Sequence, residues 1–294
     1  MASGRSTKET RREQTRRRVE AQRAAQLRAE RRRRVTYAIG IPLALLAAIG
    51  LIVLVAVNRA APVTTSFGAA PASVVTPLTT VPASALDSVG VGTTTTDTTK
   101  KLTGAALTSK GKPRVLYAGA EYCPYCAFER WGMVVALSRF GTFTGLDLMK
   151  SSPTDVYPNM NTLSFRNASY TSKYLVFDGT ELQDRNGAVL QELPAADNAL
   201  FSSIGGGSYP FIDVGGRWYQ STSGTTTALN AVHGKTWQQI ADALKDPSSP
   251  VAKAVLGTAN QLTAQICSIT NDQPSTVCSA SGVQAAAKAL SSVQ

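Results

Sequence analysis

The chain has 294 residues and 43% hydrophobic content, which is enough to bury a core and excludes a wholly disordered protein. Its net charge of +11 is not spread evenly along the sequence. Residues 1–34 hold 13 Lys and Arg against 4 Glu, a net of +9, which leaves 11 − 9 = +2 for the rest. The basic charge therefore belongs to a terminal tail, and no nucleic-acid partner is expected.

A long uncharged segment, residues 35–57, follows this tail. As a helix it would extend about 34 Å, enough to cross a ~30 Å hydrocarbon core. A secretory signal peptide is the alternative, although its apolar core normally has only about 7–15 residues. Four arginines, residues 31–34, precede the segment, so the positive-inside rule places residues 1–34 in the cytoplasm. We expect a single-pass cell-membrane protein whose tail contacts anionic lipid headgroups and whose C-terminal domain is extracytoplasmic.

Residues 58–99 are rich in Ala, Pro, Thr and Ser and predict an extended linker. The extracytoplasmic domain should then occupy residues 100–294. Its first clear element is residues 115–118, an apolar run ended by glycine that predicts a buried strand. Three apolar residues at helical spacing, Phe128, Trp131 and Val135, predict a helix ending at Gly141.

Further strand signals lie at residues 143–149 and 174–177, followed by a turn at 184–187. Residues 150–200 as a whole are interpreted as an insertion with some strand content. A hairpin is expected over residues 211–220. Thr236 and Gln239 form a predicted capping box for a helix reaching about Lys245. Residues 250–294 predict a helical C-terminal extension.

The residues between the first strand and the first helix, Glu121-Tyr122-Cys123-Pro124-Tyr125-Cys126, carry the candidate chemistry. Unpaired N–H groups and the dipole at a helix N-terminus stabilise an anion, so the Cys123 thiol should have a lowered pKa. Pro124 costs no hydrogen bond in the first turn. Cys126 is close enough in sequence to form a disulfide with Cys123. We therefore assign Cys123 as the attacking thiol and Cys126 as the resolving thiol.

A strand, C-P-Y-C and a helix in this order resemble the active site of the thioredoxin superfamily. Over roughly residues 100–245 the resemblance implies an α/β, thioredoxin-like fold with a cis-proline facing the disulfide. Tyr209-Pro210, just before the predicted hairpin, matches that proline. The resemblance makes these two residues, with Pro124 and Tyr125, the expected substrate-binding residues; a trans turn proline is the alternative. A residue that thioredoxins keep as a buried Asp is Tyr117 here, which argues against a general reductase.

The whole layout also resembles an uncharacterised family of membrane-anchored extracytoplasmic proteins, a domain of unknown function. The shared segments are residues 162–165, residues 170–174 and the stretch from Ile266-Cys267 to Val277-Cys278. This second resemblance implies a layout and no substrate.

Two further cysteines, Cys267 and Cys278, flank a turn-prone stretch and are expected to form a structural disulfide. A second redox pair exchanging electrons with the first is the alternative. The spacing does not match the paired knuckles of structural zinc sites, so no metal is expected. His233 is interpreted as a loop residue.

The predicted function is thiol-disulfide oxidoreduction on exported proteins, without a cofactor and with an unknown membrane redox partner. The compartment favours disulfide formation or isomerisation over reduction, although C-x-x-C pairs span both directions. The alternative is a non-enzymatic, membrane-tethered binding or assembly module in which the cysteines form a stable clasp.

Overall fold

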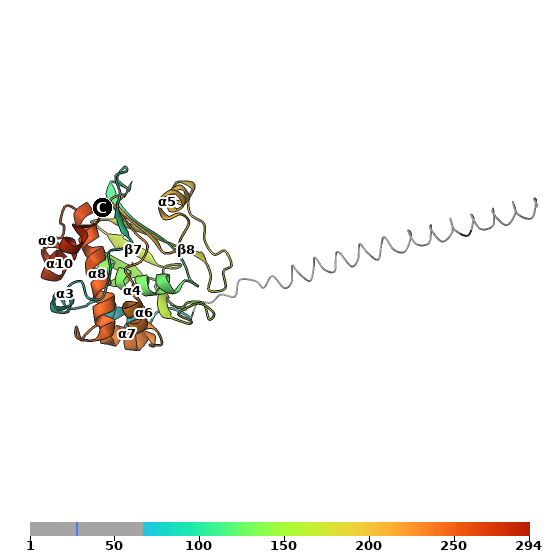
Figure 1. Ribbon diagram of the computed structural model, residues 1–294, viewed down its shortest axis with the longest axis horizontal. Coiled ribbons are helices and arrows are strands. Elements are labelled where there is room, and N and C mark those ends of the chain that lie inside the picture. Colours follow the sequence, from blue (N-terminus) through green and yellow to red (C-terminus); the bar gives the residue numbers. More distant parts are fainter. Residues whose placement is uncertain (1–27, 29–66) are drawn as a thin grey trace, which may run out of the picture. The chain divides into compact units, whose positions relative to one another are not determined.

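The computed structural model describes Arg28 and residues 67–294 (Figure 1). The predicted membrane segment 35–57, nearly all of the basic tail and the first part of the predicted linker lie outside these residues. None of the helices that the structure describes is long and apolar enough to cross a membrane. The described part has a mixed α/β architecture built on a six-stranded mixed sheet.

The central strand of this sheet is β3, Lys112–Ala120, whose last six residues are all buried. On one side it pairs in parallel with β8, Val176–Gln183, in a register that sets Tyr117 opposite Gly179. On the other side it pairs antiparallel with β9, Phe211–Val214. The sheet continues through β10 (Trp218–Gln220) and β1 (Thr99–Lys101), and β2 (Thr108–Ser109) pairs with the start of β3.

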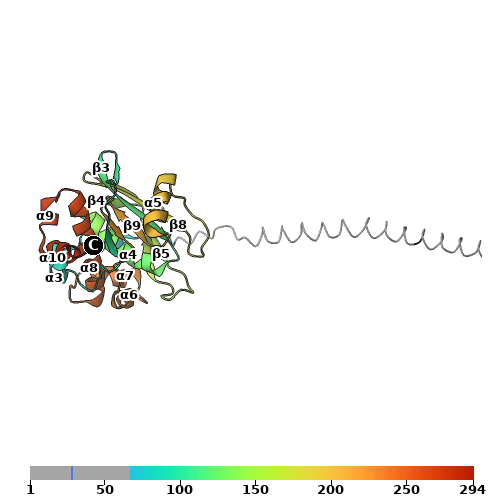
Figure 2. The ribbon, with the colours of Figure 1, turned by 45° about the horizontal axis from the view of Figure 1, so that its top comes forward.

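Alternate residues of β3 point to opposite faces of the sheet and give each face its own apolar cluster. Val115 and Tyr117 join the main core with α4, Pro124–Ser138. Leu116 and Ala118 pack with Phe201 of α5, Ala195–Gly205. Residues 67–294 are therefore arranged in three layers, with α5 on one side of the sheet and α4 on the other (Figures 1 and 2).

A long, almost entirely buried helix, α8 (Pro250–Ile269), packs against α4 in the second helical layer. The two helices approach closely at Gly132, where a Cβ atom would lie 2.3 Å from the Thr258 methyl group. Two short helices, α6 (Thr226–Val232) and α7 (Trp237–Ala243), also contact α8. The predicted capping box is present at the start of α7, with Thr236 and Gln239 bonded reciprocally. The C-terminal helices thus complete the core rather than extend from it.

The predicted strand at residues 143–149 is two strands instead. Gly145 has a φ of +72°, which breaks the run between β4 (Gly141–Thr144) and β5 (Asp147–Lys150). A Cβ at Gly145 would also lie 2.5 Å from the Asn167 carbonyl oxygen. The two strands then take different antiparallel partners, β7 (Ser169–Ser172) and β6 (Asn161–Ser164) respectively.

The insertion predicted over residues 150–200 covers fewer residues than expected. Its C-terminal part supplies β8 to the central sheet and α5 to one face, so these elements belong to the core architecture. The strand predicted at residues 174–177 begins later and runs to Gln183. The sequence pattern did not reveal the full strand because polar residues interrupt its apolar run, among them Glu181, which is fully buried and paired with the buried Arg130.

The linker prediction is wrong for the described residues before β1. Residues 72–89 form two short helices, α2 (Ala72–Thr79) and α3 (Ala83–Val89). Pro71 and Pro82 stand at their N-caps, so these prolines begin helices instead of extending a spacer. Val74 and Leu78, one helical turn apart, and Leu86 are buried in the main core.

The C-terminal segment is helical, as predicted. After α8 come α9 (Ser275–Cys278) and α10 (Ser281–Leu290). Cys267 and Cys278 form a disulfide with an S–S distance of 1.96 Å and a Cα–Cα distance of 5.7 Å. This bond ties the end of α8 to α9 on the buried side of both elements.

Candidate active site

The cysteine pair lies where β3 ends and α4 begins. Cys123 is the N-cap residue of α4, with extended backbone angles (φ −72°, ψ 122°), and Pro124 opens the helix. The Cys126 N–H donates a hydrogen bond to Cys123 Sγ at 3.4 Å, and the Ala127 N–H donates to the Cys123 carbonyl at 3.0 Å. The thiol of Cys123 therefore occupies the position of a capping side chain, facing the unpaired N–H groups of the first turn.

The two thiols differ in burial and in acidity. Cys123 is 6% exposed and Cys126 is fully buried. A hydrogen bond from the Cys126 thiol, helped by the Cys126 N–H and the charge of Arg130, lowers the pKa of Cys123 despite its burial. Burial raises the pKa of Cys126 well above its ordinary value. Cys123 is thus the thiol that ionises first and the one that solvent can reach.

Tyr209 and Pro210 immediately precede β9, and the Tyr209 ring packs beside the cysteine pair. The Tyr209–Pro210 peptide bond is cis. Tyr209 packs with Tyr122 against the small buried cluster formed by Ala120, Cys123 and Cys126. Burial, with smaller contributions from Tyr122 and both thiols, raises the pKa of Tyr209 to about 12, so this ring stays neutral beside the pair.

Near the two cysteines lies a buried ion pair that was not predicted from the sequence. Arg130 Nη2 lies 2.6 Å from Glu181 Oε2, and Arg130 Nε donates to Glu181 Oε1 at 2.8 Å. Both side chains are fully buried. Arg130 Nη2 also donates to the carbonyl of Ala120, at the end of β3 (3.0 Å). The Arg130 guanidinium is thereby fixed against the end of β3, where the chain enters the cysteine loop, residues 121–123.

This cation acts on both thiols and on Tyr117. Its charge lowers the pKa of Cys123 and opposes the effect of burial on the pKa of Cys126. The guanidinium lies 5.9 Å from the centre of the Tyr117 ring. Burial raises the pKa of Tyr117 well above its ordinary value, and the nearby Cys126 adds to this. Among the described residues the Tyr117 hydroxyl has no hydrogen-bond partner of good geometry, although Cys126 is near enough to affect it.

Comparison with known proteins places the chain in a family. Residues 98–268 match the family model described as "Domain of unknown function (DUF929)". The chain belongs to this family. No curated protein and no solved structure matches it.

The matched DUF929 region contains the whole site described so far. It spans the central sheet, Cys123 and Cys126, the Tyr209–Pro210 bond and the Arg130–Glu181 pair. It ends within α8, one residue after Cys267, so Cys278 lies outside it.

Two of the sequence-predicted substrate residues are placed differently from Tyr209. Pro124 is buried in the first turn of α4. Tyr125 is 38% exposed and its ring lies 6.5 Å from that of Tyr157, on the loop between β5 and β6. The structure therefore brings Tyr209 onto the thiols and leaves Tyr125 on the rim, facing a neighbouring loop.

A second buried carboxylate, Glu121, lies two residues before Cys123. Burial, reinforced by the charge of Glu181, raises the pKa of Glu121 to about 7. Ser164 Oγ donates a hydrogen bond to Glu121 Oε1 at 3.1 Å. A carboxyl that titrates near neutral pH can exchange protons with its surroundings under working conditions.

One signal in the sequence could have revealed Arg130. It follows Cys126 by four residues, the spacing that puts two side chains on one face of a helix, in a run whose only other charged residue is Glu129. A cation on a buried helical face implies a buried anion, but the anion is Glu181, 51 residues away, and not the adjacent Glu129.

The residues that the structure describes contain no group of three or more His, Cys, Asp or Glu side chains that could hold a metal ion. Cys267 and Cys278 are bonded to each other and offer no thiolate to a metal. His233, the one histidine of the chain, contacts the carbonyl of Pro158 through Nε2 at 3.1 Å.

Proposed function

We propose that this protein is a thioredoxin-like thiol-disulfide oxidoreductase, anchored in the membrane by residues 35–57 and acting on exported proteins outside the cytoplasm. The observation that carries the proposal is the asymmetric thiol pair: a nearly buried Cys123 with a lowered pKa at a helix N-terminus, over a fully buried Cys126 with a raised one. Catalytic thiols occupy this kind of microenvironment, whereas structural buried thiols are inert.

The thioredoxin-like part of the proposal is supported by the order of the elements. A strand, the helix that begins at the cysteines and a parallel strand are followed by an antiparallel hairpin. The cis Tyr209–Pro210 bond stands at the start of that hairpin, next to the thiols. A proline there leaves the preceding backbone free to pair with an extended substrate segment.

In the oxidising direction, a substrate thiolate attacks Cys123 Sγ of the oxidised pair. The Cys123–Cys126 bond breaks, a mixed disulfide forms, and the electron pair of the broken bond stays on Cys126, which takes up a proton. A second substrate thiolate then attacks the substrate sulfur of the mixed disulfide and releases Cys123 as a thiolate. The two electrons now held by the pair pass to a membrane partner that carries its own disulfide.

Disulfide formation or isomerisation is favoured over reduction because the site stabilises the reduced form. A lowered pKa of Cys123 makes its thiolate a better leaving group and makes the pair a stronger oxidant. In isomerisation the same thiolate attacks a substrate disulfide, and the final release of Cys123 leaves no net change in electrons.

The experiment is trapping in cells. A Cys126→Ala variant lacks the resolving thiol, so it should accumulate mixed disulfides through Cys123 with exported proteins. The matched control is Cys123→Ala, which should trap none because Cys126 is buried. Failure of Cys126→Ala to trap anything above this control would instead support a non-enzymatic binding or assembly module.

A further inference from the structure

Beside the cysteine pair lies a cavity of about 560 Å³, within the ~300–1,000 Å³ range of ligand sites. Tyr122 forms one wall, and it is both the residue before Cys123 and a neighbour of Tyr209 in the thiol cluster. The loop between β5 and β6, residues 151–160, and the turn after β8 form the other walls. Its lining includes Tyr122, Ser152, Thr154, Gln183, Arg185 and Asn186.

The loop wall is fixed to the cysteine loop. The Ser152 N–H donates to the Tyr122 carbonyl at 2.9 Å, and the Asn159 N–H closes the loop on the Ser152 carbonyl at 2.9 Å. Farther along, Pro158 is held by His233. A substrate segment in this cavity would therefore be positioned relative to the same backbone that positions Cys123.

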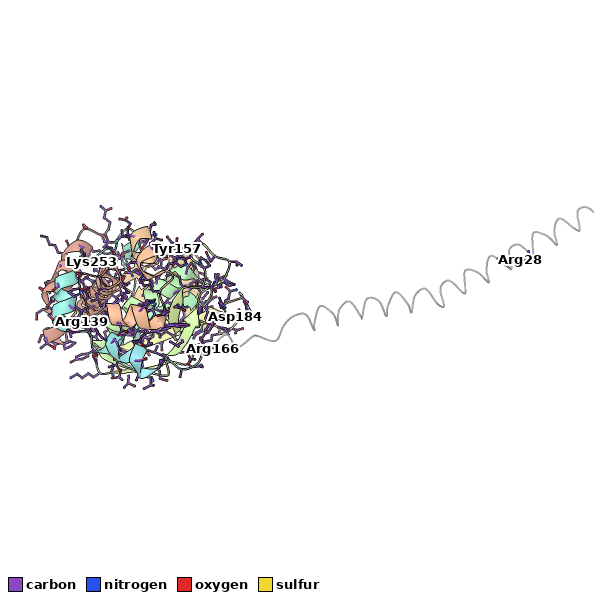
Figure 3. The ribbon with its side chains drawn as sticks, turned by 90° about the horizontal axis from the view of Figure 1, so that it is seen from below. Arg28, Arg139, Tyr157, Arg166, Asp184 and Lys253 are labelled. Carbon is purple, nitrogen blue, oxygen red and sulfur yellow. A yellow bond between two sulfur atoms is a disulfide. The ribbon has the colours of Figure 1, made fainter. Side chains whose placement is uncertain are left out.

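The turn wall is fixed as well. The Glu121 N–H donates to the Gln183 carbonyl at 2.8 Å, which ties the end of β8 to the cysteine loop. The buried Asp184 accepts from the N–H groups of Asn186 and Ala188 at 2.7 and 2.8 Å, so the turn is internally bonded. Figure 3 labels Asp184 in this turn and Tyr157 in the opposing loop.

Charge and polarity indicate what the cavity would hold. Arg185 donates from Nε to the Ser151 carbonyl at 2.8 Å and from Nη2 to Asn159. Within residues 67–294 it has no carboxylate at ion-pair distance, so its charge is not neutralised by a direct partner. The remaining lining combines hydroxyl and amide groups, which can hydrogen-bond a polar segment, with the Tyr122 ring, Pro153 and Gly187.

We propose that this cavity is the subsite for the polypeptide segment next to the reactive cysteine of the substrate, and that it selects a polar segment with a carboxylate facing Arg185. The inference rests on the proposed function and deepens it. Tyr209–Pro210 would bind the substrate backbone on one side of Cys123, while the cavity would contact the substrate side chains on the other.

The test measures the reaction of Cys123 with peptides in the full-length Cys126→Ala protein. Each capped peptide carries one cysteine as a mixed disulfide with thionitrobenzoate. The Cys123 thiolate forms a disulfide with the peptide sulfur and thionitrobenzoate leaves as a coloured thiolate, so no other oxidant or reductant is needed. The peptides differ only in having Glu, Gln or Lys beside the cysteine. Dithiodipyridine, a small neutral disulfide, is the reference reagent.

We expect the Glu peptide to react about fivefold faster than the Lys peptide at low salt, with Gln between them, because an exposed ion pair is weak and screened. Arg185→Gln should abolish this order, and Arg185→Lys should keep it because the charge is retained. Thr154→Trp, which fills the cavity from an exposed position, should lower the rate for all peptides relative to the rate for dithiodipyridine.

Three results would overturn the subsite: equal rates for the three peptides, a Glu preference that persists in Arg185→Gln, or an unchanged peptide-to-reference ratio in Thr154→Trp. These differ from failure of the proposed function. If Cys123 reacts with neither peptides nor dithiodipyridine, the thiol is not nucleophilic and both proposals fail.

Discussion

At the scale of single residues, the behaviour of Cys123 depends on three neighbours from two elements, α4 and β8. Cys126 supplies hydrogen bonds from its thiol and its N–H, and Arg130 supplies a positive charge from one turn deeper in α4. Glu181, from β8, keeps that charge in place through two short contacts. The lowered pKa of Cys123 therefore depends first on Cys126 and also on the charge of a fully buried ion pair.

Removing the buried cation should make Cys123 less acidic. Arg130→Met alone would strand the Glu181 carboxylate and cost about 3–5 kcal/mol of stability, so the informative variant is Arg130→Met with Glu181→Leu. We expect a higher pKa for Cys123 in this double variant, measured from the pH dependence of alkylation. Arg139→Met, at the far end of α4 (labelled in Figure 3), is the matched control and should leave that pKa unchanged. An unshifted Cys123 pKa in the double variant would remove Arg130 from the account.

Glu121 should make the stability of the protein depend on pH. Because burial raises its pKa in the folded state to about 7, above the ~4.3 of a free Glu, the folded protein holds a proton that the unfolded chain has lost between these values. The contribution of Glu121 to the free energy of unfolding is thus highest below about pH 4 and falls as the pH rises to about 7.

Comparison with Glu121→Gln isolates this effect from other buried carboxyls, such as Asp213, whose pKa burial also raises, to about 6. The stability difference between the two proteins should shift by about 3 kcal/mol in favour of the variant between pH 4 and pH 8. Urea unfolding across this range measures it. A constant difference at all pH values would mean that Glu121 titrates normally.

At the scale of elements, α2 and α3 show how short helices contribute to the core. Leu78 and Leu86 are 1% and 2% exposed, and Asn260 of α8 donates to the carbonyls of Leu86 and Gly90, each at 2.8 Å. These contacts attach residues 72–89, which were predicted to belong to a linker, to the helical layer that contains α8.

Leu78→Ala should therefore destabilise the protein by about 2–4 kcal/mol, the usual cost of a large-to-small change in a core. Val156→Ala is the control, since Val156 is 72% exposed and its truncation should change stability by less than about 0.5 kcal/mol. Chemical denaturation of both variants measures the change in the free energy of unfolding. If Leu78→Ala and Val156→Ala were equally stable, residues 72–79 would not contribute to the core and the linker prediction would be correct for them.

The sequence predicted those parts of the fold and the site that depend on local order. The strand before Cys123, the helix after it and the Thr236 capping box follow from residues close together in the chain. Tyr209 could be placed by resemblance to a known active site, and it does pack on the thiols.

The parts that could not be predicted depend on distant contacts. Because β8 carries the buried Glu181, it lacks a continuous apolar run. Glu181 can be buried there because it pairs with Arg130, and this partner lies 51 residues away in the sequence. The helices at residues 72–89 are short and stabilised by packing on α7 and α8, which composition alone cannot show. The prolines at their N-caps favoured the wrong interpretation.

At the scale of the whole molecule, the two cysteine pairs have different surroundings. Cys267 and Cys278 form a disulfide between α8 and α9, whereas Cys123 and Cys126 are free thiols at the start of α4. Replacing Cys267 and Cys278 together by Ala should lower stability by about 3 kcal/mol, because a short loop is no longer closed in the unfolded chain.

The same double variant should leave the alkylation rate of Cys123 unchanged. Unfolding by guanidinium and the alkylation rate of Cys123 are measured on the same preparation. A changed alkylation rate at unchanged stability would instead make Cys267 and Cys278 a second redox pair.

The most direct test of the account is the pKa of Cys123 in the reduced full-length protein, from the rate of alkylation against pH with the modified cysteine located by mass spectrometry. We predict a pKa clearly below the ~8.5 of a free thiol, with Cys126 unreactive over the same range. A Cys123 pKa at or above ~8.5, or faster alkylation of Cys126, would contradict a nucleophilic thiolate at this site.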